Sequence, residues 1–147
     1  MFAEALQYVL TTDAGMLAIL GTKAARPDST NGVFPVLAIE SPTMPYLVVS
    51  QVSGVPSAGE TMTGTGALTT ERWRFSCYGT SYLNAKRFAK YTRRFLLSLY
   101  GPQTAAKVTV QSVDLLMEAD DSEDLGKGTL YGTHFDIEFT YFDGDTA

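Results

Sequence analysis

Residues 129–142 (TLYGTHFDIEFTYF) alternate between apolar and polar side chains, and this alternation constrains the fold more than any other feature of the chain. One face would carry Tyr131, Phe135, Ile137, Phe139 and Tyr141, and the other would carry His134, Asp136, Glu138 and Thr140. A period of two is that of a β-strand, and one hydrated face is typical of antiparallel sheets. The segment therefore predicts a strand whose apolar face needs a covering layer.

Helical patterns elsewhere in the chain can supply that layer. Apolar residues at spacings of three and four predict an opening helix; they are Phe2, Ala5, Leu6, Val9 and Leu10. Asp13 is placed to cap a short helix over residues 14–20, which Gly21 ends. A further helix is expected after Gly79, with Thr80 or Ser81 as its cap and an end before Gly101. Its buried stripe would be Tyr82, Ala85, Phe88, Ala89, Thr92, Leu96 and Leu99.

The remaining apolar segments predict strands. These are residues 36–40, 46–53, 71–78 and 107–117, and the prolines that flank the first hold it to the edge or end of a sheet. In the last, the apolar phase shifts near Ser112, which indicates a bulge. Residues 53–70 contain four glycines and predict a long loop; we favour a loop that orders against a partner, and a tolerated flexible insertion is the alternative.

This order of elements predicts an α+β fold in which helices pack on one face of a mainly antiparallel sheet. A chain of 147 residues suffices for a single domain, residues 1–147. No segment approaches the ~20 apolar residues of a membrane span, and the N-terminus lacks the pattern of a signal peptide. We therefore expect folding in the cytoplasm and no membrane partner.

The motifs of common catalytic and cofactor sites are incomplete. Cys77 and His134 are the only cysteine and histidine, too few ligands for tetrahedral zinc. The glycines at 59 and 64 are not followed by the lysine of a phosphate-binding loop, and the acidic residues 118–124 fit no calcium-loop register. Cys77 shares a strand face with Trp73 and Phe75 and is expected to be buried. We expect no catalytic residue, no metal and no cofactor.

Two alternatives stay open. Asp136 and Glu138, near His134, could form a carboxylate pair for acid–base catalysis, although a hydrated strand face explains the same pattern. A nucleic-acid-binding role would use the basic residues 72–94, but a net charge of −5 opposes sequence-independent binding to phosphate.

Charge is unevenly distributed along the chain. Residues 72–94 hold seven of the eleven basic residues and no acid, a charge of +7, whereas residues 114–145 carry −9. The basic set is Arg72, Arg74, Lys86, Arg87, Lys90, Arg93 and Arg94. A strongly dipolar subunit attracts copies of itself head to tail, and such a contact closes into a ring or grows a filament. The basic set is therefore a candidate subunit interface, facing the acidic region of a neighbouring copy or another partner. Two ordinary hydrated faces are the alternative.

The succession of motifs resembles a known family. The segments are ALQYVLTTDAGMLAILG, MPYLVVSQVSG, ERWRFSCYGTSYLNAKRFAKYTRRFLLSL, VQSVDLLMEADD and GTLYGTHFDIEFTYF. In this order and spacing they resemble the tail completion, or tail terminator, proteins of long-tailed bacteriophages, over nearly the whole chain. Residues 22–44 and 53–70 are longer than the family pattern.

The resemblance implies a structural virion protein at the neck, assembled in the bacterial cytoplasm. It implies a ring, typically of six copies, that caps the head-proximal end of the tail tube, stops its polymerisation and docks the head connector. Another neck component, a head completion or stopper protein, is the nearest alternative. DNA passes through such a ring without specific binding. A channel that repels phosphate would be bordered by part of an acidic set: Glu118, Asp120, Asp121, Glu123, Asp124, Asp136 and Glu138.

Overall fold

The computed structural model describes residues 2–39, 42–56, 67–103, 107–120, 123–124 and 129–143. Its elements follow the order α1 (Phe2–Thr12), α2 (Ala14–Leu20), β1 (Val33–Pro35), β2 (Tyr46–Pro56), β3 (Ala67–Gly79), α4 (Tyr82–Leu97), β4 (Gly101–Pro102), β5 (Val108–Asp120), β6 (Glu123–Asp124) and β7 (Thr129–Asp143). The strands form a sheet in the order β1-β2-β3-β7-β5-β4, with β6 paired to β7. Only β1 and β2 are parallel among these pairs.

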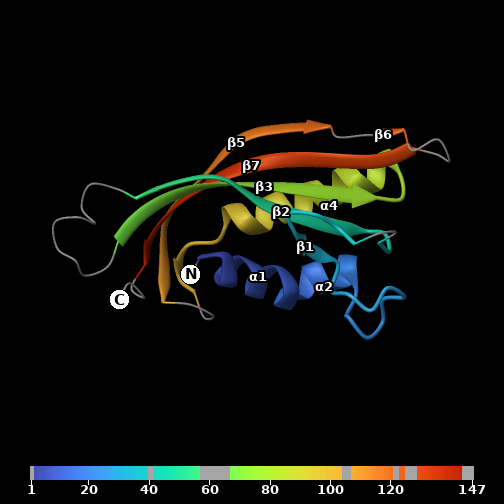
Figure 1. Ribbon diagram of the computed structural model, residues 1–147, viewed down its shortest axis with the longest axis horizontal. Coiled ribbons are helices and arrows are strands. Elements are labelled where there is room, and N and C mark those ends of the chain that lie inside the picture. The colour runs from blue at the N-terminus through green and yellow to red at the C-terminus, as the bar shows by residue number, and fades with distance from the viewer. Residues whose placement is uncertain are drawn as a thin grey trace.

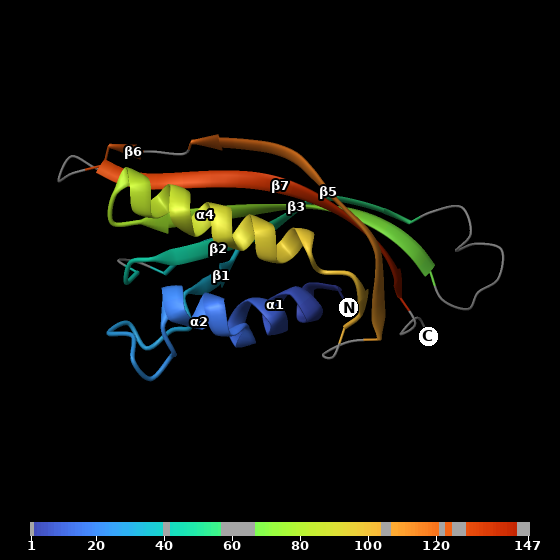
Figure 2. The same cartoon turned by 180° about the vertical axis from the view of Figure 1, so that it is seen from behind.

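The sheet is curved, and α1, α2 and α4 all lie on its concave face (Figure 1; Figure 2). The predicted α+β class, with helices on one face of a mainly antiparallel sheet, is confirmed. We call the face that carries the helices the inner face and the opposite one the outer face.

The core lies between the helices and the inner face. Phe2 of α1 stacks on Tyr141 of β7, with ring centroids 4.7 Å apart, and lies 4.8 Å from the ring of Phe139. The predicted apolar residues of β7 from Phe135 to Tyr141 are all buried, as are Phe75 and Cys77 of β3. Burial of each large apolar side chain stabilises the fold by about 1.5–3 kcal/mol, so the alternation in β7 fixes which face the helices cover.

The predicted helix caps are confirmed. Asp13 accepts a hydrogen bond from the Met16 N–H at 3.0 Å, and Ser81 accepts one from the Asn84 N–H at 3.2 Å. The position before α4 requires glycine, because a Cβ at Gly79 would lie 2.7 Å from the backbone nitrogen of Ala85, which is too close. Within the predicted stripe of α4, Tyr82 is an exception with 45% of its surface exposed.

The predicted strand at residues 36–40 is wrong over residues 36–39, the part of it that the structure describes. The chain pairs with β2 earlier, at Val33–Pro35, and leaves the strand at Val36, whose φ of 66° is a left-handed conformation. This conformation is uncommon for a β-branched residue. Val36 and Leu37, at 68% and 79% exposure, therefore project from the end of β1 instead of entering the sheet.

The predicted loop at 53–70 is shorter than expected, because β2 and β3 extend into it and pair as far as Pro56 and Thr69. Residues 57–66 lie outside the described residues, and their predicted role with a partner stays a prediction. In β5 the expected bulge near Ser112 is confirmed by a register shift between Val110 and Ser112. A second shift, between Leu115 and Met117, was not predicted, and β5 continues to Asp120.

Candidate assembly surfaces

Asp136 lies on the outer face of β7, directly opposite Arg74 of β3. Its Oδ1 accepts from Arg74 Nε at 2.8 Å, and its Oδ2 accepts from Arg72 Nη2 at 2.6 Å. The two guanidinium groups lie over the carboxylate, so Asp136 is 0% exposed even though no helix covers this face. Asp136 therefore lies on the face that the alternation predicts, but the expectation that it is hydrated there is wrong.

These contacts decide the protonation of Asp136. Burial raises the pKa of its carboxyl group. The hydrogen bonds from Arg74 and Arg72 together lower the pKa by more than burial raises it, so the pKa falls below its ordinary value. A general acid or base needs a proton that exchanges near the working pH. Asp136 is held ionised by two cations instead, and this argues against the catalytic pair with Glu138.

The second bulge of β5 determines where the acidic residues of this strand point. Before it, Leu115 pairs with Ile137 and shares the inner face, which places Asp114 on the outer face beside Glu138. After it, Glu118 pairs with Phe135 and Asp120 with Thr133. Because one extra residue reverses the alternation of side chains, Glu118 and Asp120 lie on the inner face, next to α4.

Both acids pair with α4 of the same chain. Arg93 Nη1 lies 2.9 Å from Glu118 Oε2, and Lys86 Nζ lies 2.5 Å from Asp120 Oδ1. Tyr82 Oη donates to Asp120 Oδ2 at 3.2 Å. The hydrogen bond with Asp120 raises the pKa of Lys86, and the same bond lowers the pKa of Asp120. Both charges are therefore fixed at neutral pH.

The seven basic residues consequently form separate groups. Arg72 and Arg74 cover Asp136 on the outer face, and Lys86 and Arg93 pair with β5. The other three, Arg87, Lys90 and Arg94, are exposed along α4, and no ion pair with another described residue is found for them. The separation of charge in the sequence is thus partly cancelled by folding. A role of the seven in subunit contacts stays a prediction.

The acidic set is also divided between surfaces. Glu118 and Asp120 face α4, Asp136 is buried, and Glu138 is half-buried on the outer face. Glu123 and Asp124 form β6, and Asp121 lies outside the described residues. Asp136 cannot repel a passing phosphate as a free charge, because two arginines neutralise it. The channel-facing role of the set stays a prediction.

Cys77 is 0% exposed, as predicted. Burial raises the pKa of its thiol, a hydrogen bond with Thr92 opposes this shift, and the charge of Glu118 adds to it. The thiol therefore stays protonated and is no nucleophile. Among the described residues there is no group of three or more His, Cys, Asp or Glu side chains that could hold a metal. No helix in the described ranges is long and apolar enough to span a membrane.

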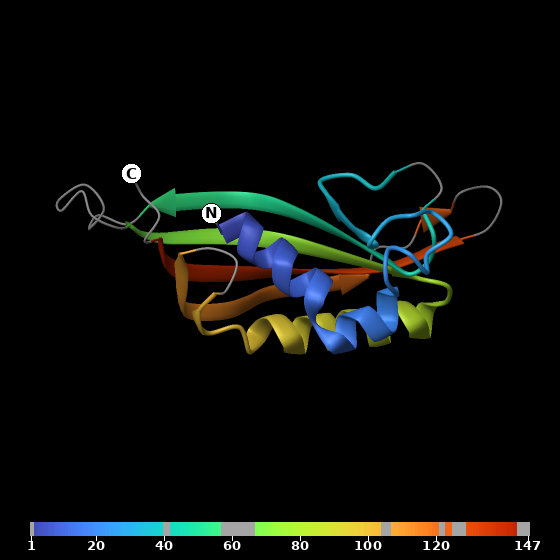
Figure 3. The same ribbon diagram turned by 90° about the horizontal axis from the view of Figure 1, so that it is seen from below.

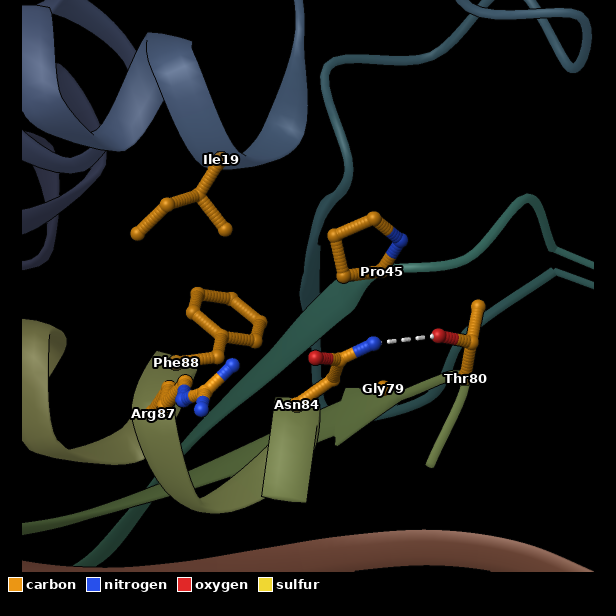
Figure 4. A pocket seen from close by; sticks show the side chains of 7 residues that line it. All are labelled: Ile19, Pro45, Gly79, Thr80, Asn84, Arg87 and Phe88. Carbon is orange, nitrogen blue, oxygen red and sulfur yellow. Dashed lines mark hydrogen bonds between the residues drawn. The ribbon is translucent and has the colours of Figure 1, made fainter. Parts of the chain in front are cut away.

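A cavity of about 220 Å³ opens between α2 and the start of α4. Ile19 and Phe88 approach each other across it, and Asn84 Nδ2 donates to Thr80 Oγ1 at 2.8 Å on its rim (Figure 4). Its lining is Ile19, Pro45, Gly79, Thr80, Asn84, Arg87 and Phe88. Arg87 is the one ionisable residue in that lining, so the cavity suits an apolar side chain and lacks the acid–base pair of an active site.

Sequence reasoning missed a buried ion pair in the segment before β2. The side chains of Arg26 and Asp28 are 3% and 7% exposed. Arg26 Nη1 donates to the carbonyl oxygens of Leu20 and Pro45, both at 2.8 Å, and Asp28 Oδ2 accepts from the Thr43 N–H at 2.8 Å. The segment has only the composition of a loop, and nothing local indicates that its arginine is buried.

No family model matches the chain, and no curated protein matches it. Among solved structures, it is similar to a chain in the virion of a native gene transfer agent particle. That match has a TM-score of 0.59 and 15% sequence identity, and it covers 95% of this chain and 92% of the other. At this identity the likeness is one of fold, and it extends over nearly the full length of both chains.

Proposed function

We propose that the chain is a structural virion protein whose copies form a ring at the head-proximal end of a phage tail tube. The ring, of six copies, stops polymerisation of the tube and joins the tail to the head connector. The observation that carries this proposal is the likeness of fold, over 95% of the chain, to a chain of a virion particle. The order of sequence motifs typical of tail terminators supports the finer role.

The side-chain chemistry supports an assembly role over an enzymatic one. Asp136, the acid best placed for catalysis by sequence, is enclosed by Arg72 and Arg74, and Cys77 is buried and protonated. Exposed apolar residues instead cluster near β1 and along β5, where copies or other virion proteins can cover them. The partners we propose are further copies, the tube protein and the connector or stopper, with DNA passing through unbound.

The test is electron microscopy of the purified protein, alone and mixed with tail tubes. We expect rings on one end of each tube, and tubes that stop lengthening when the protein is added during polymerisation. Binding to portal rings without binding to tubes would indicate a head completion or stopper protein instead. If the protein binds neither assembly, or binds DNA with a steep salt dependence, the proposal is wrong.

A further inference from the structure

Among the described residues, one border of the sheet is open along the second half of β2. The short strand β1 pairs only with Leu47–Val49, through the bonds Leu47 N–H to Gly32 O and Val36 N–H to Val49 O. Beyond Val49 no described element lies beside β2, which forms the upper border of the sheet in Figure 3. Because pairing groups alternate along a strand, the N–H and C=O of Gln51 also point away from β3.

In the part of the chain that the structure describes, the opposite border is open along β5. The strand β4 pairs only with Thr109 and Val110, and Gln103 N–H donates to Val108 O at 2.8 Å. From Ser112 to Asp120, β5 pairs with β7 alone among the described strands. The same alternation, counted through the bulge near Ser112, directs the backbone groups of Val113 and Leu115 away from β7.

The two open segments are only partly protected against pairing: each contains a bulge, but neither is densely charged. Natural edge strands are commonly blocked by lysine or other charges. Residues 51–54 carry no charge, and the open part of β5 carries Asp114, together with Glu118 and Asp120, which are paired with α4. Instead, each segment exposes an apolar residue at a bulge: Val52 is 47% exposed and Leu116 is 43% exposed. Val36 and Leu37 lie beside the first edge, and Leu115, 39% exposed, adds to the second.

The directions of the two edges match. The pairs β2–β3, β3–β7 and β7–β5 are all antiparallel, so β2 and β5 run in opposite directions. If two copies stand the same way up, β2 of one therefore meets β5 of the next as an antiparallel neighbour. This contact joins two different surfaces and repeats, which is the requirement for a ring.

We infer that the open half of β2 pairs with the open part of β5 of a second copy, so that the sheet continues from subunit to subunit. The pairing satisfies the outward backbone groups of both edges and removes Val52 and Leu116 from water. The occupant is another copy because the chain itself carries both matching edges. The inference deepens the proposed ring and rests on it.

Charge placed at either edge tests this interface. Val52→Lys and Leu116→Lys each put an ammonium group at a position that is exposed in the monomer and buried between copies. We expect each to weaken association between copies about tenfold or more, measured by sedimentation in the presence of tube fragments. Leu83→Lys is the matched control, since Leu83 is 61% exposed and belongs to α4, not to either edge strand. Unchanged thermal unfolding would show that the variants are folded.

Cross-linking gives a second measurement that does not depend on loss of assembly. Val52→Cys is combined in turn with Gln111→Cys, Asp114→Cys and Leu116→Cys, because a disulfide requires Cα atoms about 4.4–6.8 Å apart and the register between copies must be sampled. Cys77 is fully buried and can remain. We expect at least one combination to oxidise into a ladder of covalent oligomers, whereas Val52→Cys with Leu83→Cys should not.

The outcomes separate the interface from the proposed function. If both lysine variants still cap tubes as the parent does and no cysteine pair cross-links, the edge pairing is wrong and the ring role stands. If the ladder forms but tubes are never capped, the edge pairing stands and the terminator role is wrong.

Discussion

Arg74 and Asp136, 62 positions apart in the chain, meet across β3 and β7 with Nε and Oδ1 separated by 2.8 Å. With Arg72 they form a charged cluster on a sheet face that no helix covers. The chain thus neutralises on folding part of the charge that its sequence separates. What remains for partners is the exposed row of Arg87, Lys90 and Arg94, together with the open sheet edges.

Asp136→Asn should destabilise the protein. The substitution leaves two arginines without their carboxylate, and breaking a buried ion pair costs about 3–5 kcal/mol. The arginine side chains are 35% and 41% exposed, so water screens their charge, and we expect a loss of about 2 kcal/mol in the free energy of unfolding. Urea denaturation measures it. Glu138→Gln, two residues along the same face and half-buried, is the control and should cost much less.

Acid should destabilise the protein over a pH range that the pKa values of Asp28 and Asp136 determine. Hydrogen bonds lower the pKa of both carboxyl groups in the folded state from the ordinary value of 3.8, despite burial, which raises it. The unfolded chain therefore binds protons first as the pH falls, and the stabilisation is present above pH 3.8 and lost below it. Urea titrations from pH 7 to pH 2 should show a decline that starts near pH 4 and is shallower in Asp136→Asn. An identical decline in the parent and the variant would contradict this assignment.

Strong periodicity made much of the fold predictable. The alternation in residues 129–142 and the stripe beginning at Phe2 report burial directly. The cap Asp13 was recognisable, and the cap of α4 was narrowed to Thr80 or Ser81, of which the structure has Ser81. The exception, Asp136, has the sequence pattern of a hydrated residue. Its burial depends on Arg72 and Arg74, whose position on the adjacent strand cannot be known before the strands are paired.

The other wrong predictions, in β1 and β5, share a physical cause. In each strand the backbone conformation at one residue changes the direction of the side chains or of the chain after it. The bulge at Leu116 turns Glu118 and Asp120 toward α4, although the mixed residues 114–120 show no clear period. Val36 likewise ends β1 because its backbone is left-handed, although valine is a β-branched residue that favours continuation of the strand. Both features are settled by tertiary packing rather than by local preference.

Asp28→Asn should loosen the segment before β2. Asp28 accepts hydrogen bonds from Arg26, from Thr30 and from the Thr43 N–H, so the variant leaves the nearly buried guanidinium of Arg26 without a counter-charge. We expect a loss of about 3 kcal/mol, the low end for a broken buried pair. Hydrogen exchange should quicken at residues 26–45 before the core strands are affected. Lys23→Met, an exposed change in the same segment, is the control, and equal exchange in both variants would contradict the role of the pair.

The paired and unpaired basic residues of α4 should respond differently to charge reversal. Lys86→Glu places a carboxylate beside Asp120, and the double change Lys86→Glu/Asp120→Lys restores the attraction within one chain. Thermal unfolding should therefore show a destabilised single variant and a recovered double variant. Lys90→Glu with Arg94→Glu breaks no pair within the described part of the chain, so its free energy of unfolding should fall only by the ~1 kcal/mol that an acid in the last turn of a helix costs. If the exposed row contacts an acidic partner, this second variant should instead lose affinity for tubes or further copies, and more so at low salt, where charge attraction is least screened. Full assembly of the Lys90→Glu/Arg94→Glu protein at low salt would show that Lys90 and Arg94 are only hydrated surface.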